Sequence, residues 1–278
     1  MIQSAPMRRS FVLYLVFQWA ALTVSAAEWK LIWSDEFEGP AGSPVESSKW
    51  TAEVGGNGWG NQELEYYKSD PANAHLDGSG NLVIVALKEA RGTYQTRFGN
   101  GNYSSARLIT KGKFEFMHGR VEARIQIPSG KGLWPAFWML GNDFPAVDWP
   151  RCGEVDIMEN IGRQPSVVHG TIHGPGYSDD EGPTASYRLP NPEKFSDDFH
   201  VYAVEWDANA IRWYVDENLY ETRTPADLPP HKPWVFNHPF YLLLNLAVGG
   251  DWPGPPNKKT VFPGEMKVDY VRVYQNQS

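Results

Sequence analysis

The sequence has 278 residues, of which 14% are aromatic, and it carries 33 acidic and 25 basic side chains. The net charge of −8 disfavours nucleic acids and anionic membranes as partners, because both are held by basic surfaces. It also disfavours sulfated or uronic acid polysaccharides, whereas a neutral polymer is compatible with it.

Residues 1–27 have the pattern of a signal peptide, with Arg8 and Arg9 before an apolar run from Phe11 to Val24 and small residues at 25–27. The run is shorter than the roughly 18–20 residues of a spanning helix, although a retained membrane anchor is the alternative. Met7 is an alternative start. Cleavage would leave 23 basic and 33 acidic side chains on residues 28–278, a net charge of −10. We expect one secreted or periplasmic domain that is monomeric and not bound to a membrane.

Short strands dominate the rest of the chain, and no long stretch has helical periodicity. Gly and Pro are frequent between the apolar runs, as turns require. Short strands at regular intervals predict an all-β sandwich or barrel. In chain order the expected strands are 82–87, two arms around a turn at 118–119 within 114–127, a meander of 201–206, 211–215 and 219–223, then 241–247 and 268–274.

Cys152 is the only cysteine, so no intrachain disulfide can form. We interpret it as a small buried side chain rather than a nucleophile. The sequence also lacks the C-x-x-C and H-E-x-x-H spacings that are typical of transition-metal sites.

The segment 153–160, Gly-Glu-Val-Asp-Ile-Met-Glu-Asn, places three carboxylates within six residues. Its apolar residues favour a strand, on which Glu154 and Asp156 share one face. Glu159 would then point to the opposite face, unless a β-bulge between Asp156 and Glu159 turns it back. Carboxylates crowded on one face suit glycoside hydrolysis, which uses a pair of them. A solvated strand face is the alternative interpretation.

This segment resembles the catalytic strand of family 16 glycoside hydrolases, in the bulged form of laminarinases, which are endo-β-1,3-glucanases. Several ordered motifs are more specific than one short pattern, and the resemblance covers essentially residues 28–278. It implies a β-jelly-roll of two curved antiparallel sheets with a concave substrate cleft. The further matching segments are Trp33–Phe37, Gly55–Tyr67, Ser105–Arg107, Gly132–Leu140 and Asn245–Pro253.

The resemblance assigns a role to each carboxylate. Glu154 would be the nucleophile, Glu159 the acid/base, and Asp156 would orient the nucleophile. Hydrolysis would retain the anomeric configuration through a covalent intermediate. Mutual repulsion should keep at least one of the three protonated near neutral pH.

Neutral sugars pack their C–H faces on indole rings, and a subset of the tryptophans lies in Gly- and Pro-rich segments that suit loops or strand ends. The resemblance and this position predict sugar contacts for Trp59, Trp134, Trp138 and Trp252. Three polar residues are further substrate-binding candidates, although each is equally consistent with a structural role: Asn57, Arg107 and His173.

No cofactor is expected for catalysis, but the resemblance implies a structural calcium ion between the first and last strands, away from the cleft. Its ligands would be the Asp269 carboxylate and the backbone carbonyls of Glu36 and Gly80. Oxygen ligands of this kind suit calcium.

The leading hypothesis is a secreted endo-acting β-1,3-glucanase whose partner is a β-glucan polysaccharide. A β-1,3-1,4-glucanase, an agarase or a transglycosylase could use the same acids. Non-bulged relatives, which include lichenases and xyloglucan-active enzymes, usually show a shorter E-x-D-x-E spacing, so the longer spacing found here disfavours them. The cleft-loop segment 57–67 favours laminarin as the substrate. A non-catalytic β-glucan-binding protein is the alternative from another class. Such proteins typically lack one or both glutamates, and both are present here.

Overall fold

The computed structural model describes Met1, residues 28–90 and residues 92–277. The predicted signal peptide therefore lies outside the described residues, apart from Met1. Within the described part of the chain, no helix is long and apolar enough to cross a membrane. The only helices there are two short 3₁₀ turns, η1 (Asp179–Glu181) and η2 (Pro225–Asp227).

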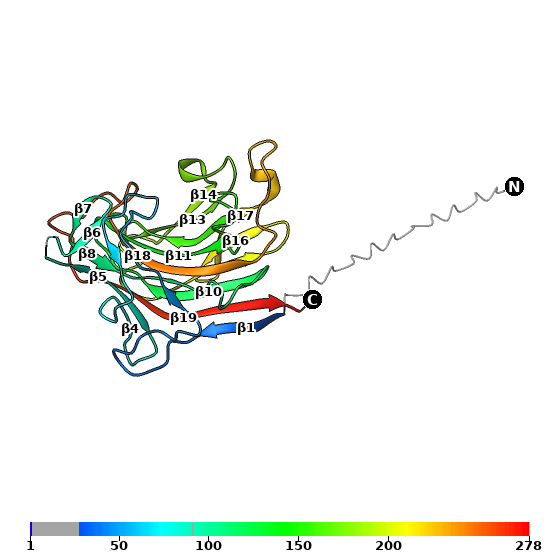
Figure 1. Cartoon of the computed structure of the whole chain (residues 1–278). Helices are drawn as coiled ribbons and strands as arrows, with labels where there is room; N and C mark the ends of the chain where they lie inside the picture. Colours follow the sequence, from blue (N-terminus) through cyan, green and yellow to red (C-terminus); the bar gives the residue numbers. More distant parts are fainter. Residues whose placement is uncertain (2–27, 91, 278) are drawn as a thin grey trace.

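Two sheets lie one above the other, as Figure 1 shows, so the predicted all-β sandwich is confirmed. The ten-stranded sheet has the order β17-β16-β15-β10-β19-β5-β8-β3, with β1 also paired to β19 and β4 to β5. Its pairs are antiparallel except for the two-residue pair of β3 with β8. Its strands are β1 (Trp29–Asp35), β3 (Tyr66–Tyr67), β4 (Ala74–Leu76), β5 (Leu82–Lys88), β8 (Tyr103–Ser105), β10 (Gly119–Gln126), β15 (His200–Trp206), β16 (Ile211–Val215), β17 (Asn218–Arg223) and β19 (Gly264–Asn276).

The seven-stranded sheet has the order β14-β13-β12-β11-β18-β9-β2 and is antiparallel throughout. A separate hairpin joins β6 (Tyr94–Thr96) to β7 (Gly99–Gly101). The strands of the seven-stranded sheet are β2 (Thr51–Ala52), β9 (Arg107–Ile109), β11 (Leu133–Gly141), β12 (Glu154–Glu159), β13 (Val167–His173), β14 (Thr184–Arg188) and β18 (Phe240–Val248).

The strands with strong apolar patterns were predicted correctly. The meander β15-β16-β17 is confirmed, as are β5, β18 and β19, although β19 is longer than expected. The first arm of the predicted 114–127 pair is wrong. Phe116 forms only an isolated bridge to Phe240, and its buried ring packs against Trp206.

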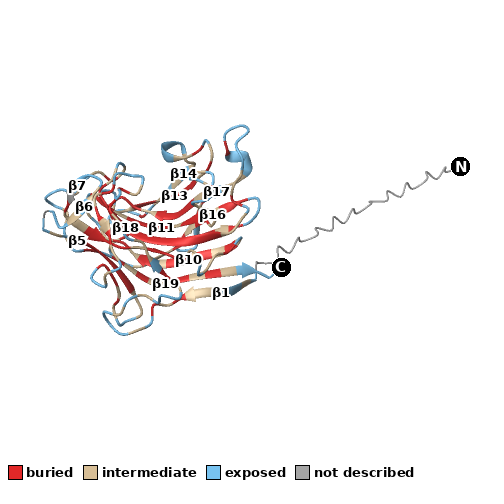
Figure 2. Cartoon of the chain, viewed as in Figure 1, coloured by how far each residue is buried: buried red, intermediate tan, exposed pale blue. Residues whose placement is uncertain are grey.

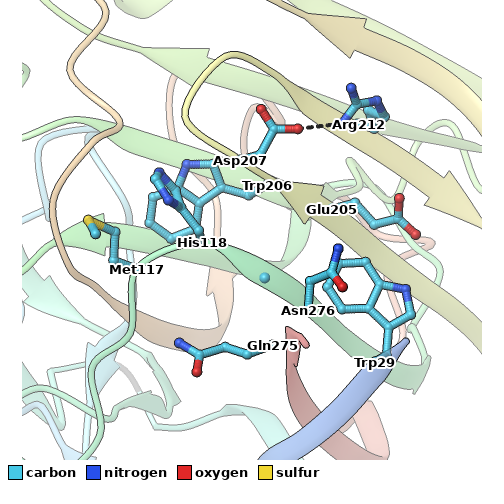
Figure 3. A pocket seen from close by; sticks show the side chains of 10 residues that line it. Trp29, Met117, His118, Glu205, Trp206, Asp207, Arg212, Gln275 and Asn276 are labelled. Carbon is cyan, nitrogen blue, oxygen red and sulfur yellow. Dashed lines mark hydrogen bonds and ion pairs between the residues drawn. The ribbon is translucent and has the colours of Figure 1, made fainter. Parts of the chain in front are cut away.

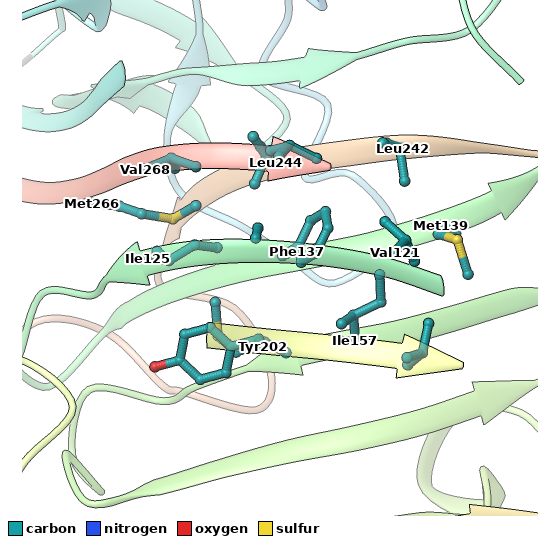
Figure 4. Close-up of a cluster of buried hydrophobic side chains, with 14 of the residues drawn as sticks. Val121, Ile125, Phe137, Met139, Ile157, Tyr202, Leu242, Leu244, Met266 and Val268 are labelled. Carbon is teal, nitrogen blue, oxygen red and sulfur yellow. The ribbon is translucent and has the colours of Figure 1, made fainter. Parts of the chain in front are cut away.

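The core lies between the two sheets, where apolar side chains from both meet (Figures 2 and 4). On β11 and β18 alternate residues such as Phe137 and Leu244 enter this core. Because neighbouring residues of a strand point to opposite faces, Trp138 and Asn245 must lie on the other face of the seven-stranded sheet. We call this the outer face, and it carries the predicted site.

Candidate active site

The predicted bulge in β12 is confirmed. On β11, Phe137 pairs with Met158 and Trp138 pairs with Asp156, so Ile157 has no partner of its own. Ile157 and Met158 are consecutive, yet both are fully buried in the core. The extra residue returns Glu159 to the face of Glu154 and Asp156, because both apolar side chains point inward.

Two neighbours explain why the bulge fits. Gly170 on β13 stands opposite the bulged pair, and any side chain there would come within 2.5 Å of the Trp213 ring. The indole N–H of Trp213 donates a 2.7 Å hydrogen bond to the backbone carbonyl of Asp156. A buried tryptophan from the other sheet thus occupies the space beside a glycine and satisfies a backbone group at the bulge.

Each carboxylate of the acid cluster, Glu154, Asp156 and Glu159, has a nitrogen neighbour from a surrounding ring. Trp149 Nε1 donates to Glu154 Oε2 at 2.8 Å, and Trp134 Nε1 donates to Glu159 Oε1 at 3.0 Å. His173 Nε2 lies 3.1 Å from Asp156 Oδ2 and 3.9 Å from Glu154 Oε1. His173 therefore contacts the acid cluster from the neighbouring strand β13, while its predicted role in substrate binding stays a prediction.

Burial dominates the electrostatics of the acid cluster. Burial first, and the Asp156 charge second, raise the pKa of Glu154 to about 8. Burial raises the pKa of Asp156 to about 7, while its hydrogen bond with Glu154 acts in the opposite direction. Burial, followed by the charge of Asp156, holds the pKa of Glu159 well above its ordinary value. The cluster therefore keeps protons near neutral pH, which a proton donor in catalysis requires.

Two of the four predicted tryptophans are direct neighbours of these acids, because Trp134 hydrogen-bonds Glu159 and Trp138 is the ladder partner of Asp156. Trp134 is held by Glu159 and meets Trp252 edge-on, with ring centroids 5.6 Å apart. Trp134 lies at the start of β11, as the prediction of a loop or strand end allows, but the same prediction is wrong for Trp138, which lies in the middle of the strand. The Gly and Pro residues around them were misleading, since Pro135 is accommodated inside the strand and pairs with Leu246. Trp59 and Trp252 do lie in turns.

Arg107 connects two of the predicted tryptophans. Its guanidinium carbon lies 4.8 Å from the ring centroid of Trp59 and 4.8 Å from that of Trp138. The same side chain donates to Glu53 Oε2 at 2.5 Å. Asn57 is exposed and accepts a 2.9 Å hydrogen bond from the backbone N–H of Trp59, so it shapes the turn that presents this indole. Contact of these residues with a sugar stays a prediction.

Sequence reasoning missed Trp149 and His169 as neighbours of the acids. Trp149 bonds Glu154 directly, and its position five residues upstream was the available signal. His169 stands opposite Glu159 in the β12–β13 ladder, and its ring centroid lies 5.0 Å from that of Trp252. Alternation along β13 from His173 would have placed it on the same face.

A second buried acidic group was also missed. Glu63 and Glu65 are both buried, in the segment that leads from Trp59 to β3. Their alternation with apolar Leu64 was the signal, since Glu63, Glu65 and Tyr67 fall on one side of an extended chain. Cys152 is buried as predicted, and burial raises the pKa of its thiol to about 12, so a thiolate is strongly disfavoured.

The predicted calcium ligands come from segments that meet at one end of the ten-stranded sheet. Asp35 pairs with Val271 and Leu82 pairs with Val268, which brings the chain near Glu36 and Gly80 to the strand that carries Asp269. A side chain at Gly80 would come within 3.9 Å of the Glu36 carbonyl oxygen. Asp269 Oδ2 accepts from Arg124 Nη1 at 2.7 Å, which leaves Oδ1 for a cation. These oxygens are of the kind that calcium prefers, and one of the two carboxylate oxygens already accepts a hydrogen bond from Arg124, so the calcium site stays a prediction.

A separate cavity of about 350 Å³ lies where β1, β10, β15 and β19 meet (Figure 3). Trp29, His118, Glu205 and Arg212 are among the residues that line it. It contains none of the predicted site residues, and its arginine is paired with Asp207. This cavity is therefore not the predicted active site, and the acid cluster on the outer face remains the candidate site.

Comparison with known proteins supports this assignment. The model of the family "Glycosyl hydrolases family 16" matches residues 60–272. A beta-glucanase from Rhodothermus marinus is 44% identical over 260 residues, covering 90% of this chain and 86% of that protein. Glucan endo-1,3-beta-glucosidase A1 from Niallia circulans is 39% identical, and the match covers 90% of this chain but 38% of that longer protein. The solved endo-beta-1,3-glucanase of Pyrococcus furiosus superposes with a TM-score of 0.84 at 49% identity, covering 91% of this chain and 96% of that one.

Proposed function

Because the chain belongs to family 16 of the glycosyl hydrolases, we propose that it is an endo-acting β-1,3-glucanase that cleaves laminarin-type glucan with retention of anomeric configuration. The jelly-roll fold is shared with these relatives. The observation that carries the proposal is the bulge that gathers Glu154, Asp156 and Glu159 on one face.

In the first step Glu154 attacks the anomeric carbon, and Glu159 gives its proton to the departing glycosidic oxygen. Partial ionisation near pH 7 to 8 supplies a carboxylate from the pair Glu154 and Asp156. The raised pKa of Glu159 keeps it protonated for its role as acid. Asp156, which His173 contacts, orients Glu154 through their hydrogen bond.

In the second step Glu159 accepts a proton from water, which then attacks the glycosyl ester. The charge of Glu154 is one of the causes that raise the pKa of Glu159. Ester formation removes this charge, so the pKa of Glu159 falls when the residue must act as a base. The same residue thereby serves both steps.

The proposal includes the fate of the protein in the cell. We infer that residues 1–27 are removed during export and that the mature enzyme acts as a monomer in the periplasm or outside the cell. A structural calcium ion held by Glu36, Gly80 and Asp269 would stabilise the fold without taking part in the chemistry. N-terminal sequencing of the exported protein would test the predicted cleavage.

The main test is to incubate the purified protein with laminarin, mixed-linkage β-glucan and agarose, and to size the products. We expect a ladder of oligosaccharides from laminarin, with the β-anomer dominating early proton NMR spectra. Cleavage of agarose but not of laminarin would contradict the proposal that β-1,3-glucan is the substrate. Release of the α-anomer would contradict the two-step mechanism.

A further inference from the structure

A directed chain of hydrogen bonds, of which all but the one at Trp138 are fully buried, connects Glu63 to Trp138. Trp138 Nε1 donates to Asn245 Oδ1 at 2.7 Å, Asn245 Nδ2 donates to the Tyr67 hydroxyl at 3.2 Å, and Tyr67 donates to Glu63 Oε2 at 3.0 Å. An indole is only a donor, so it fixes the orientation of the Asn245 amide. The amide in turn fixes the direction of the Tyr67 hydroxyl, and Glu63 must be the terminal acceptor.

Glu65 completes this chain at its buried end. Its Oε2 accepts a 2.6 Å hydrogen bond from the backbone N–H of Val248, whereas Oε1 is buried without a partner of its own. Burial, and next the charge of Glu63, hold the pKa of Glu65 well above its ordinary value. Burial also raises the pKa of Glu63, but the hydrogen bond with Glu65 acts in the opposite direction there. Two adjacent buried carboxylates cannot both ionise cheaply, so Glu65 keeps its proton and donates it to Glu63.

The same group supports the other aromatic side chain of this region. The Tyr67 ring meets Trp59 edge-on with centroids 5.2 Å apart. Arg107 lies over both indoles, and the charge of Glu63 is among those that stabilise its guanidinium. Glu53 is the anion that forms the ion pair with Arg107, whereas Glu63 acts on it only through its charge. The charge of Glu63 therefore stabilises the Arg107 guanidinium. Glu63 also supports Trp138 through the hydrogen bonds of Tyr67 and Asn245.

We propose that Glu63 and Glu65 share one proton and act as positioning residues that hold Trp138, Arg107 and Trp59 in place for binding the glucan chain. This inference rests on the proposed function, because it assigns these three side chains to substrate binding. Neither glutamate touches the acid cluster in any hydrogen bond of the described residues. Their effect should therefore appear in substrate binding rather than in the chemical step.

Glutamine substitutions distinguish the two glutamates. In Glu65→Gln the amide N–H replaces the shared proton, so the chain keeps its direction. In Glu63→Gln one acceptor oxygen becomes a donor, which opposes Tyr67 or Asn61, the two side chains that now donate to it. The charge beside Arg107 is also lost. The exposed Glu265 provides a matched Glu→Gln control.

The experiment measures kcat and KM on laminarin for these variants, with thermal unfolding as the check on folding. We expect Glu63→Gln to raise KM about tenfold with kcat within about twofold of wild type. Glu65→Gln should raise KM by less than Glu63→Gln, because its amide keeps the hydrogen bond, and the control Glu265→Gln should stay within about twofold in both constants. Tyr67→Phe interrupts the same chain and should reproduce the rise in KM if Glu63→Gln fails to fold.

Two results would overturn the inference. An equal loss in Glu63→Gln and Glu65→Gln would show that the pair does not share a proton in this arrangement. An unchanged KM in both Glu63→Gln and Tyr67→Phe would show that the chain does not position the binding side chains. Failure of the wild-type protein to cleave laminarin would instead contradict the proposed function.

Discussion

At the scale of single residues, the acid cluster is defined by the groups that solvate it. Trp149 and Trp134 each donate to one glutamate, and His173 contacts Asp156. These donors compensate only part of the cost of burying three carboxyl groups, so the pKa values stay high. The three identities and their common face were predictable from the sequence. The indole donors were not, because they depend on which residues of other segments the fold brings near.

Replacing either glutamate by alanine tests the two catalytic roles. We expect Glu154→Ala and Glu159→Ala each to lower kcat by at least about 10² to 10⁴, and the double variant to lose little more, because the groups act as one unit. Azide with an activated substrate should rescue Glu159→Ala with a β-glycosyl azide and Glu154→Ala with an α-azide. Exchange of these two stereochemical outcomes would show that the roles are reversed.

The raised pKa of Glu154 also predicts how stability depends on pH. A carboxyl group with a higher pKa in the folded protein binds its proton more tightly there, so its stabilising effect is present at low pH. This effect is lost as the pH rises from the ordinary value of 4.5 to the folded value of about 8. Glu154→Gln removes the titration, and its side chain is only 16% exposed in the wild type.

We therefore expect the free energy of unfolding of Glu154→Gln, relative to wild type, to increase by about 2 to 4 kcal/mol between pH 5 and pH 8. Denaturant unfolding of both proteins at the two pH values measures this difference. Glu265→Gln, an exposed control, should show no such change. The same offset at both pH values for Glu154→Gln would contradict the raised pKa.

At the scale of the element, β12 shows how one residue sets the geometry of a site. The bulge was predictable because the spacing of Asp156 and Glu159 cannot place both on one face of a regular strand. Its structural support was not, since Gly170 and Trp213 come from other strands. Similarly, β11 was not predicted from the sequence, because Pro135 and the nearby glycines are typical of loops. The strand nevertheless pairs along its whole length with β18.

Deleting Ile157 tests whether the bulge is needed to present the acids. Without it the sequence alternates regularly, with Glu154, Asp156 and Glu159 outward and Val155 and Met158 inward. We expect a folded protein with reduced stability, because truncating a buried isoleucine costs about 2 to 5 kcal/mol. It should keep roughly 1% or more of wild-type activity and exceed Glu159→Ala, since all three acids stay on one face.

Ile157→Ala is the matched control, because it removes the same core contacts without changing the register. Unfolding temperatures and kcat on laminarin are measured for the three proteins side by side. If the deletion folds like Ile157→Ala but is as inactive as Glu159→Ala, the bulge itself sets the catalytic distance between the carboxylates. That result would refute the idea that sharing a face is sufficient.

At the scale of the whole molecule, the two-sheet sandwich follows from the density of short apolar strands, and the family resemblance specified its topology. The sequence patterns could not predict which strands far apart in the sequence pair with each other. β1 pairs with β19, so both ends of the described domain lie side by side in one sheet (Figure 1). The hairpin of β6 and β7 was also missed, because its residues lack a strong apolar alternation.

The joining of the first and last strands gives the calcium prediction its physical basis. An ion held by Asp269 and the carbonyls of Glu36 and Gly80 would link β1, β5 and β19 in the folded protein only. Free calcium at about 100 times its dissociation constant should then stabilise the fold by about 2.7 kcal/mol. For a domain of this size that corresponds to a rise of roughly 5 to 10 °C in Tm.

Thermal unfolding with calcium and with EDTA measures the shift, and isothermal calorimetry measures binding directly. Asp269→Asn should abolish both signals, because an amide binds the ion more weakly than a carboxylate. Arg124→Gln is the necessary control, since Asp269 is also paired with Arg124 at 2.7 Å. Arg124→Gln should keep or strengthen calcium binding because it frees an oxygen of Asp269. If neither calcium nor EDTA changes the Tm, the prediction is wrong, and Asp269 serves as the partner of Arg124 rather than as a calcium ligand.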